Sequence, residues 1–121
     1  MQTWIKTDKN SDFSIYNLPF GVYSLKNKNK RIGVAIGDLI LDLNAINKLG
    51  VFDELNINSN VFVSNYLNDF ISLGKKTTVK AREILQKELC NISSVLRNDK
   101  SIFIKQKDVT MHMPVKIGDY T

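Results

Sequence analysis

The chain has 121 residues, of which 43% are hydrophobic and 24% are charged. This length is typical of a single domain, and the composition is that of a globular protein rather than a disordered one. Cys90 is the single cysteine and His112 the single histidine, which excludes an internal disulfide, a cysteine-based zinc site and a multi-histidine metal site. One cysteine also fits a reducing compartment.

The apolar runs are short, for example residues 32–36 and 39–41. None approaches the roughly 20 residues that a membrane-spanning helix needs. The first residues, Met-Gln-Thr-Trp, are followed by charges at Lys6, Asp8 and Lys9, unlike a secretory or organelle-targeting leader. We therefore expect a cytoplasmic protein with no membrane partner.

The net charge is +5, from seventeen Lys and Arg residues against twelve Asp and Glu residues. An excess of basic residues favours nucleic-acid binding. However, only three of the seventeen are arginines, the side chain that best recognises phosphate and guanine. The one dense cluster, Lys26–Arg31, alternates Lys with Asn, which favours a solvated hairpin loop over a phosphate clamp.

The first half of the chain predicts β-structure. Residues 20–24 are extended, and two runs rich in apolar residues, 31–36 and 39–43, flank a Gly-Asp turn signal at 37–38, which indicates a hairpin. Because both runs are apolar nearly throughout, both faces of the sheet should be partly covered. Gly33 inside a strand predicts a bulge or a tight bend. Three strands joined by short turns favour a small barrel over a flat sheet.

The middle of the chain predicts helices. Asn44 is the expected N-cap of a short turn that ends at Gly50, and Ser64 is the expected N-cap of a second helix through Leu73. A third and longest helix should begin at Thr77 or Thr78 and run to about residue 96. Its apolar residues form one stripe at helical spacing: Ala81, Ile84, Leu85, Leu89, Ile92, Val95 and Leu96.

Cys90 falls opposite this stripe on a helical wheel, so we expect its thiol to be exposed. A redox or nucleophilic thiol needs a stabilising partner, and the sequence places no histidine near Cys90. The interpretation that Cys90 has no chemical role is therefore preferred.

Extended segments return near the C-terminus. Residues 101–105 are predicted to be extended, and residues 109–113 alternate, with three apolar side chains on one face and Thr110 and His112 on the other. Pro114 ends this run or marks a sheet edge.

The predicted fold class is therefore mainly β with helices, a small β-barrel with two or three helices packed on it. The barrel should consist of residues 14–43 and 109–116, and the helices of residues 64–97 should pack on it or at its side.

A search for catalytic chemistry finds no convincing site. The sequence contains no Gly-rich phosphate loop, and one histidine does not suffice to argue for a Ser-His-Asp set. Turn and cap chemistry accounts for Asp38 and Asp42. His112 lies a few residues before Asp119 and Tyr120, but a structural role is the preferred interpretation for it. The residues alone therefore predict a module without an active site.

The chain nevertheless resembles the N-terminal part of the fumarylacetoacetase family. The first matching motif is Ser11-Asp-Phe13 followed by NLPFGVY at 17–23, which is similar to the family's SDF…NLPYGVF. The second is RIGVAIGDLILDL at 31–43, which is nearly identical to the family's sequence there. The third is MHMPVKIGDYT at 111–121, which resembles MHLP..IGDYT. The resemblance runs from about residue 11 to the last residue, and only residues 50–62 and 100–108 diverge.

The resemblance implies an SH3-like N-terminal domain at residues 1–115, followed at 116–121 by the start of a connection into a catalytic domain. The whole enzyme would hydrolyse a carbon–carbon bond of fumarylacetoacetate, the last step of tyrosine and phenylalanine breakdown. It would use Ca or Mg and a water activated by a His backed by a Glu. It would act as a homodimer, with no nucleic-acid partner.

In the family, the metal ligand, a substrate-binding Tyr and the basic His follow the IGDYT segment. Asp119 and Tyr120 correspond to residues before that ligand, which the family does not use. No catalytic, substrate-binding or metal position is therefore predicted in this chain, and no cofactor is expected in it.

Two rival interpretations remain open. A stand-alone interaction module would need clustered exposed aromatic side chains, for which Tyr16, Phe20 and Tyr23 are the candidates, although a core or interdomain role is preferred for them. A basic nucleic-acid-binding barrel is the other rival and would bind in a salt-dependent manner.

The last residues contain few charges and resemble the middle of a domain rather than a tail. We therefore expect an apolar patch around Met111, Met113 and Ile117 that docks on the catalytic domain. Without that domain, self-association at the patch or poor order at 116–121 is expected.

Overall fold

The computed structural model describes residues 3–5, 15–26 and 28–112. The predictions for Met113, Pro114 and Ile117, and for Asp119 and Tyr120, lie outside these residues. So do the start of the predicted barrel at residue 14 and its end at 113–116.

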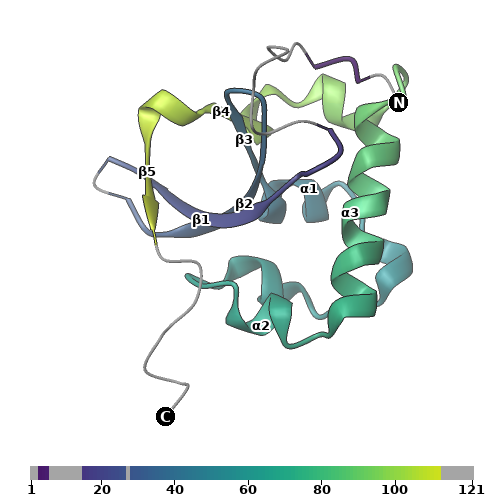
Figure 1. Ribbon diagram of the computed structural model, residues 1–121, viewed down its shortest axis with the longest axis horizontal. Helices are drawn as coiled ribbons and strands as arrows, with labels where there is room; N and C mark the ends of the chain where they lie inside the picture. Colours follow the sequence, from purple (N-terminus) through teal and green to yellow (C-terminus); the bar gives the residue numbers. More distant parts are fainter. Residues whose placement is uncertain (1–2, 6–14, 27, 113–121) are drawn as a thin grey trace.

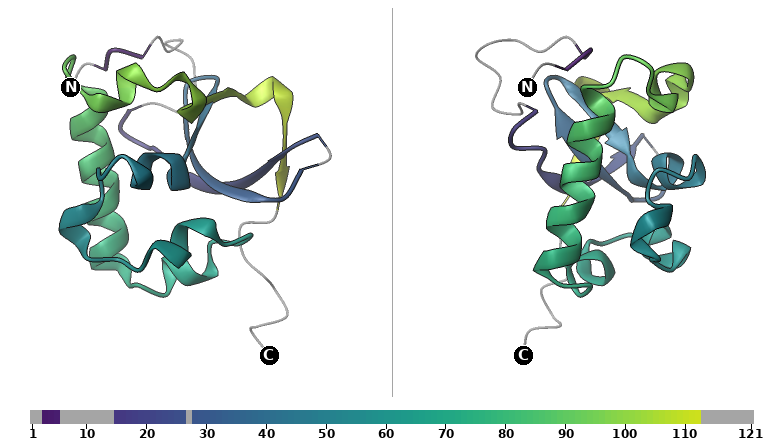
Figure 2. Two further views of the ribbon diagram at one scale, coloured as in Figure 1. Left: turned by 180° about the vertical axis from the view of Figure 1, so that it is seen from behind. Right: turned by 90° about the vertical axis from the view of Figure 1, so that its right-hand side faces the viewer.

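Within the described residues, five antiparallel strands form one sheet in the order β4-β3-β2-β1-β5. The strands are β1 (Phe20–Leu25), β2 (Arg31–Ile36), β3 (Leu39–Asp42), β4 (Phe103–Lys105) and β5 (Val109–His112). The sheet curls into a half-barrel, with helices on one side of it (Figures 1 and 2). The predicted fold class, mainly β with helices and a small SH3-like barrel, is confirmed.

The predicted hairpin at 37–38 joins β2 to β3. Gly37 has a φ of 58°, a backbone conformation that glycine adopts at little cost. The turn therefore favours a glycine at this position, which is why Gly-Asp predicts it. Gln106, between β4 and β5, holds this turn by two hydrogen bonds. Its backbone N–H donates to the Asp38 carbonyl at 2.8 Å, and its side-chain Nε2 donates to the Gly37 carbonyl at 3.0 Å. The connection between the two edge strands is thereby held against the hairpin.

The two faces of the sheet bury different side chains. One face contributes Val22, Ile32, Val34, Ile36 and Leu41 to the main core beneath the helices. The other buries Tyr23, Ala35 and Ile40, against which Ile104 of β4 and Val109 of β5 pack. Because β4 and β5 are opposite edges of the sheet, their shared contacts identify this second face as the concave one. Both faces are covered, as predicted.

The helices are shorter than predicted. They are α1 (Leu43–Lys48), α2 (Asn68–Ile71) and α3 (Lys75–Leu89). Asp42, not Asn44, caps α1, because its carboxylate accepts the Ala45 amide at 2.9 Å. Ser64 does not cap α2; its hydroxyl accepts the Tyr66 amide at 3.2 Å in a local turn. The predictions of both N-caps were wrong. Short 3₁₀ turns occur at 53–55, 59–63, 95–98, 100–102 and 106–108.

The predicted third helix was too long, since α3 ends at Leu89 rather than near residue 96. Beyond it, the Asn91 side chain accepts the Ser93 amide and the Ser94 hydroxyl accepts the Leu96 amide. Such local bonds compete with the helical pattern. Ser94 in this way caps a separate 3₁₀ turn, Val95–Asn98.

The N-terminal segment covers the end of α3. Thr3 Oγ1 and the Trp4 amide both donate to the Leu89 carbonyl, at 2.6 and 3.1 Å, and Trp4 Nε1 donates to the Glu88 carbonyl at 3.0 Å. The last carbonyls of a helix lack the regular donor four residues on, so donors from elsewhere can satisfy them; the Glu88 carbonyl also accepts the Asn91 amide at 3.2 Å. Residues more than 80 positions away therefore help to end the helix.

The early end of α3 corrects the burial predictions. Ile92, which the predicted stripe places in the core, is 68% exposed. Leu96 is fully buried, but it belongs to the separate 3₁₀ turn and not to α3. Cys90 is half-buried and packs against the main core, so the expectation of an exposed thiol was wrong.

We predict that Leu85→Ala lowers the free energy of unfolding by about 2–5 kcal/mol, because Leu85 is fully buried. Ile92→Ala should change it by less than about 0.5 kcal/mol, although helical periodicity alone places Ile92 in the core. Denaturant titrations of both variants make the comparison. Equal losses would contradict the observed end of α3.

Gly33 is not a bulge, because the β1–β2 and β2–β3 registers continue through it without a shift. A Cβ there would lie 2.8 Å from Ile40 Cγ2 and 3.0 Å from both the Leu41 carbonyl oxygen and Tyr23 Cε1. Glycine is therefore needed for close packing of Tyr23 across the strand, not for its backbone conformation.

We expect Gly33→Ala to cost about 1–3 kcal/mol of unfolding free energy, as overpacking does. Gly21→Ala is the matched control in the neighbouring strand: its Cβ would meet only the flexible Met111 Cε at 3.4 Å. Gly21→Ala should leave stability unchanged or slightly raised. A loss at Gly21 as large as that at Gly33 would be inconsistent with this account.

Candidate functional site

A cluster of three polar side chains lies on the concave face. Tyr23 comes from β1, Arg31 from the start of β2 and Asp42 from the end of β3. Tyr23 pairs with Arg31, and Gly33 pairs with Asp42, so the Tyr23 ring must pass Gly33 to reach the carboxylate. The missing side chain at Gly33 makes that approach possible.

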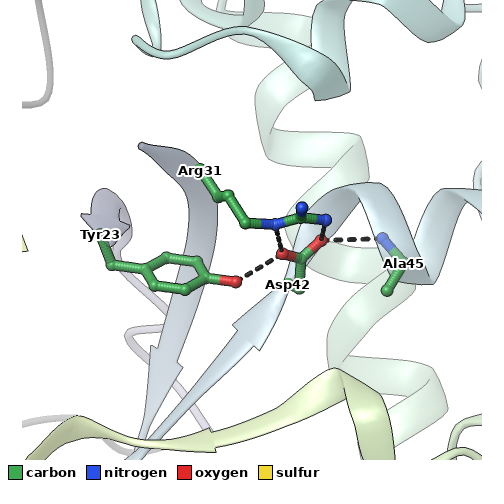
Figure 3. A network of polar contacts seen from close by, with 4 residues as sticks. All are labelled: Tyr23, Arg31, Asp42 and Ala45. Atoms are coloured by element: carbon green, nitrogen blue, oxygen red, sulfur yellow. Dashed lines mark hydrogen bonds and ion pairs between the residues drawn. The ribbon is translucent and has the colours of Figure 1, made fainter. Parts of the chain in front are cut away.

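The Asp42 carboxylate accepts four hydrogen bonds (Figure 3). Oδ2 accepts from the Tyr23 hydroxyl and from Arg31 Nε. Oδ1 accepts from Arg31 Nη2 at 3.2 Å and from the Ala45 amide at 2.9 Å. A carboxylate offers about four lone-pair sites, so Asp42 is saturated. It has no free lone pair with which to bind a metal ion or take a proton from a substrate.

The cluster stabilises the ionised form of Asp42. Burial by itself raises the pKa of this carboxyl, but the hydrogen bonds from Arg31, Tyr23 and the Ala45 amide outweigh burial and hold the pKa below its ordinary value. Burial first, then the hydrogen bond to Asp42, and after it the Asp42 charge raise the pKa of the Tyr23 phenol well above its ordinary value. Tyr23 therefore keeps its proton and acts as a donor.

A cleft of about 740 Å³ opens beside the cluster. Its wall includes the cations Lys28, Arg31 and Lys48 and the acids Asp42 and Asp99. The Arg31 side chain is 47% exposed there, and its ion pair with Asp42 already offsets its charge. The cleft thus combines opposite charges, and Asp42, its buried carboxylate, is already fully hydrogen-bonded.

The described members of the predicted basic cluster do not form a phosphate clamp. Arg31 pairs with Asp42, and the Lys30 ammonium lies 5.0 Å over the Tyr66 ring. Lys26 and Lys28 are exposed in the connection between β1 and β2, as the hairpin-loop prediction requires.

His112 has a partner that the sequence did not suggest. Its Nε2 lies 2.7 Å from Ser24 Oγ on the neighbouring strand. A nucleophilic Ser–His pair also needs an acid that orients the imidazole. Among the described residues no carboxylate is bonded to His112, and the structural role preferred for it stays a prediction.

The three aromatic candidates for a peptide groove do not form one cluster. Tyr16 is exposed, but Tyr23 is fully buried in the concave face. Phe20 is half-buried, and its ring makes a T-shaped contact with the Phe70 ring, with 4.9 Å between the ring centroids. The core role preferred for these residues is confirmed for Tyr23.

The residues that the structure describes contain no group of three His, Cys, Asp or Glu side chains able to hold a metal ion. Of the helices among them, none has both the length and the apolar character needed to cross a membrane.

The low pKa of Asp42 predicts a pH-dependent stability. The unfolded chain binds a proton at Asp42 before the folded chain does, so the contribution of Asp42 is complete above its ordinary pKa of 3.8 and is lost as the pH falls through the folded-state value. At neutral pH, Asp42→Asn should cost about 1–3 kcal/mol, because the Tyr23 and Arg31 donors lose an ionised acceptor.

The difference in unfolding free energy between Asp42→Asn and the unmodified chain should therefore shrink below about pH 4. Asp108→Asn, which alters an exposed carboxylate, is the control. Its unfolding free energy should stay close to that of the unmodified chain. A penalty for Asp42→Asn that stays constant from about pH 7 to about pH 2 would refute the linkage.

Comparisons with known proteins assign the family. A family model described as "Fumarylacetoacetase N-terminal" matches residues 16–114. The chain is 44% identical over 124 residues to the fumarylacetoacetase of Mus musculus, which covers 98% of this chain. It is 40% identical to that of Caenorhabditis elegans and 37% identical to that of Arabidopsis thaliana, each covering all of this chain.

The chain spans about 30% of the length of these relatives. The strands β1, β2 and β3 and the saturated Asp42 all lie within the matched residues. The chain therefore belongs to the fumarylacetoacetase family and corresponds to its N-terminal domain.

Proposed function

We propose that this chain is the non-catalytic N-terminal domain of an enzyme that hydrolyses 4-fumarylacetoacetate to fumarate and acetoacetate. The match of residues 16–114 to the N-terminal family model carries the proposal. In this reaction, water adds to a carbonyl carbon, the adjacent carbon–carbon bond breaks, and the carbon of the departing acetoacetate takes up a proton.

The chemistry of the described residues supports a non-catalytic role. The divalent ion that the family resemblance implies, Ca or Mg, needs several oxygen ligands. The described residues do not fit it, because no suitable group of side chains lies together and all four acceptor sites of Asp42 are occupied. We assign the metal ligands, and the His and Glu that activate water, to the remainder of the enzyme.

The domain's own contribution is structural support. Its partner is the catalytic domain of the same enzyme, to which it presents a rigid half-barrel. We further propose, on the family resemblance, that the enzyme completes tyrosine and phenylalanine breakdown in the cytoplasm as a homodimer. The interaction-module alternative loses its support because Tyr23 is buried rather than displayed.

The proposal predicts that the purified 121-residue chain does not hydrolyse fumarylacetoacetate, with Ca, with Mg or with a chelator. The enzyme produced from the complete reading frame should do so. Loss of substrate absorbance, with fumarate identified as a product, is the measurement. Turnover by the isolated chain above the buffer rate would disprove the non-catalytic role, and an inactive complete enzyme would disprove the proposed reaction.

A further inference from the structure

Two apolar clefts lie on either side of Pro19 and Phe20, which line both of them. The smaller, of about 130 Å³, opens into the concave face between Gly21, Ala35 and Met111. The larger, of about 520 Å³, lies between the start of β1 and the helices α2 and α3. The two clefts share these two wall residues, so we treat the residues around both clefts as one surface.

We call this surface the docking face. It consists of Pro19, Phe20, Gly21, Ile71, Lys75, Arg82 and Met111. Ile71 is 49% exposed and Met111 is 52% exposed, so two large apolar side chains of this face are in contact with water. Grouped apolar exposure beside clefts is characteristic of an interface, whereas single exposed apolar residues are common.

The charge of the docking face has one sign. Lys75 and Arg82 line the larger cleft, and no acidic residue among the described ones lines either cleft. The Arg82 guanidinium lies 4.8 Å over the Phe20 ring, and its Nε donates to the Leu18 carbonyl at 3.3 Å. These contacts hold a cation in place beside the Phe20 ring in the wall of the larger cleft. A partner that fits must bring an apolar side chain and a carboxylate.

The topology shows where the chain leaves the described fold. β5 is the last described strand, and its final residue, His112, pairs with Val22 of β1. The neighbours of Val22 toward the start of β1 are Gly21 and Phe20, which belong to the docking face. In the relatives, this domain is only about 30% of the chain. A tethered remainder of the enzyme thus meets this face at high effective concentration.

We propose that the docking face receives the catalytic part of the same enzyme, which places an apolar side chain in the smaller cleft and a carboxylate against Lys75 and Arg82. This inference rests on the proposed function and adds to it the surface and the chemistry of the contact. A second copy of this domain is the competing occupant, and the test below distinguishes the two.

The test measures thiol accessibility in the complete enzyme. Ile71→Cys and Met111→Cys report on the docking face, and Ile92→Cys is the matched control, because Ile92 is 68% exposed and lines neither cleft. Labelling is located by peptide mass spectrometry, which separates the introduced thiols from Cys90. We expect the two reporter thiols to react at least about tenfold more slowly than the control thiol in the native enzyme, and at equal rates in denaturant.

Charge reversal provides the second arm. Lys75→Glu should raise the labelling rate of the Ile71→Cys reporter about tenfold toward that of the control, whereas Lys80→Glu, on the same helix and outside both clefts, should not. Should either reporter fail to fold, the other suffices.

Equal native labelling of the two reporters and the control, or protection that vanishes when the enzyme is diluted, would overturn the proposal. The second outcome would assign the face to another copy. Substrate turnover is recorded for each variant, so an active enzyme with an unprotected face rejects the docking face alone. An inactive unmodified enzyme rejects the proposed function instead.

Discussion

The four hydrogen bonds to the Asp42 carboxylate join three strands and the start of a helix by side-chain contacts, in addition to the backbone ladder. They connect β1 through Tyr23, β2 through Arg31, and the start of α1 through the Ala45 amide, all at the residue that ends β3. A buried carboxylate is costly unless it is fully paired, and here every acceptor site is used. The same saturation that makes Asp42 a junction leaves its carboxylate no further acceptor site.

The sheet has two faces with different tasks. The helix-covered face holds the large aliphatic core, while the concave face is lined with small residues, Gly21, Gly33 and Ala35, around one large ring. Tyr23 fills most of that space, and its neighbours leave an apolar cleft on one side and a charged cleft on the other. The Tyr23 ring thus lies between two clefts of different chemistry inside the half-barrel.

Sequence reasoning succeeded where the determinants are local or where whole motifs could be compared. The hairpin at 37–38 depends on a single glycine conformation, and the family was assigned correctly from three separated motifs. It failed where distant residues decide. Thr3 and Trp4 contribute to the end of α3 from the other end of the chain, whereas the apolar periodicity continued past this end to Ile92.

The polar cluster was missed for the same reason. Tyr23, Arg31 and Asp42 are 8 to 19 residues apart, and nothing in their separate contexts pairs them. The available signal was Gly33, an unbulged glycine in the middle strand. Its missing side chain marks a place where a neighbouring ring crosses. Asp42 itself was correctly assigned to capping, but its other three bonds require the sheet register to be known.

The pairing of β1 with β5 has a consequence for synthesis on the ribosome. Val22 faces His112 across 90 residues, so the sheet cannot be completed until nearly all of the described chain has emerged. Contacts of such sequence separation form slowly, because a long loop must close first. Until then the free edge of β1 and the apolar concave face stay available to chaperones and to neighbouring nascent chains. The half-barrel is thus open to misassembly during translation until β5 pairs with β1.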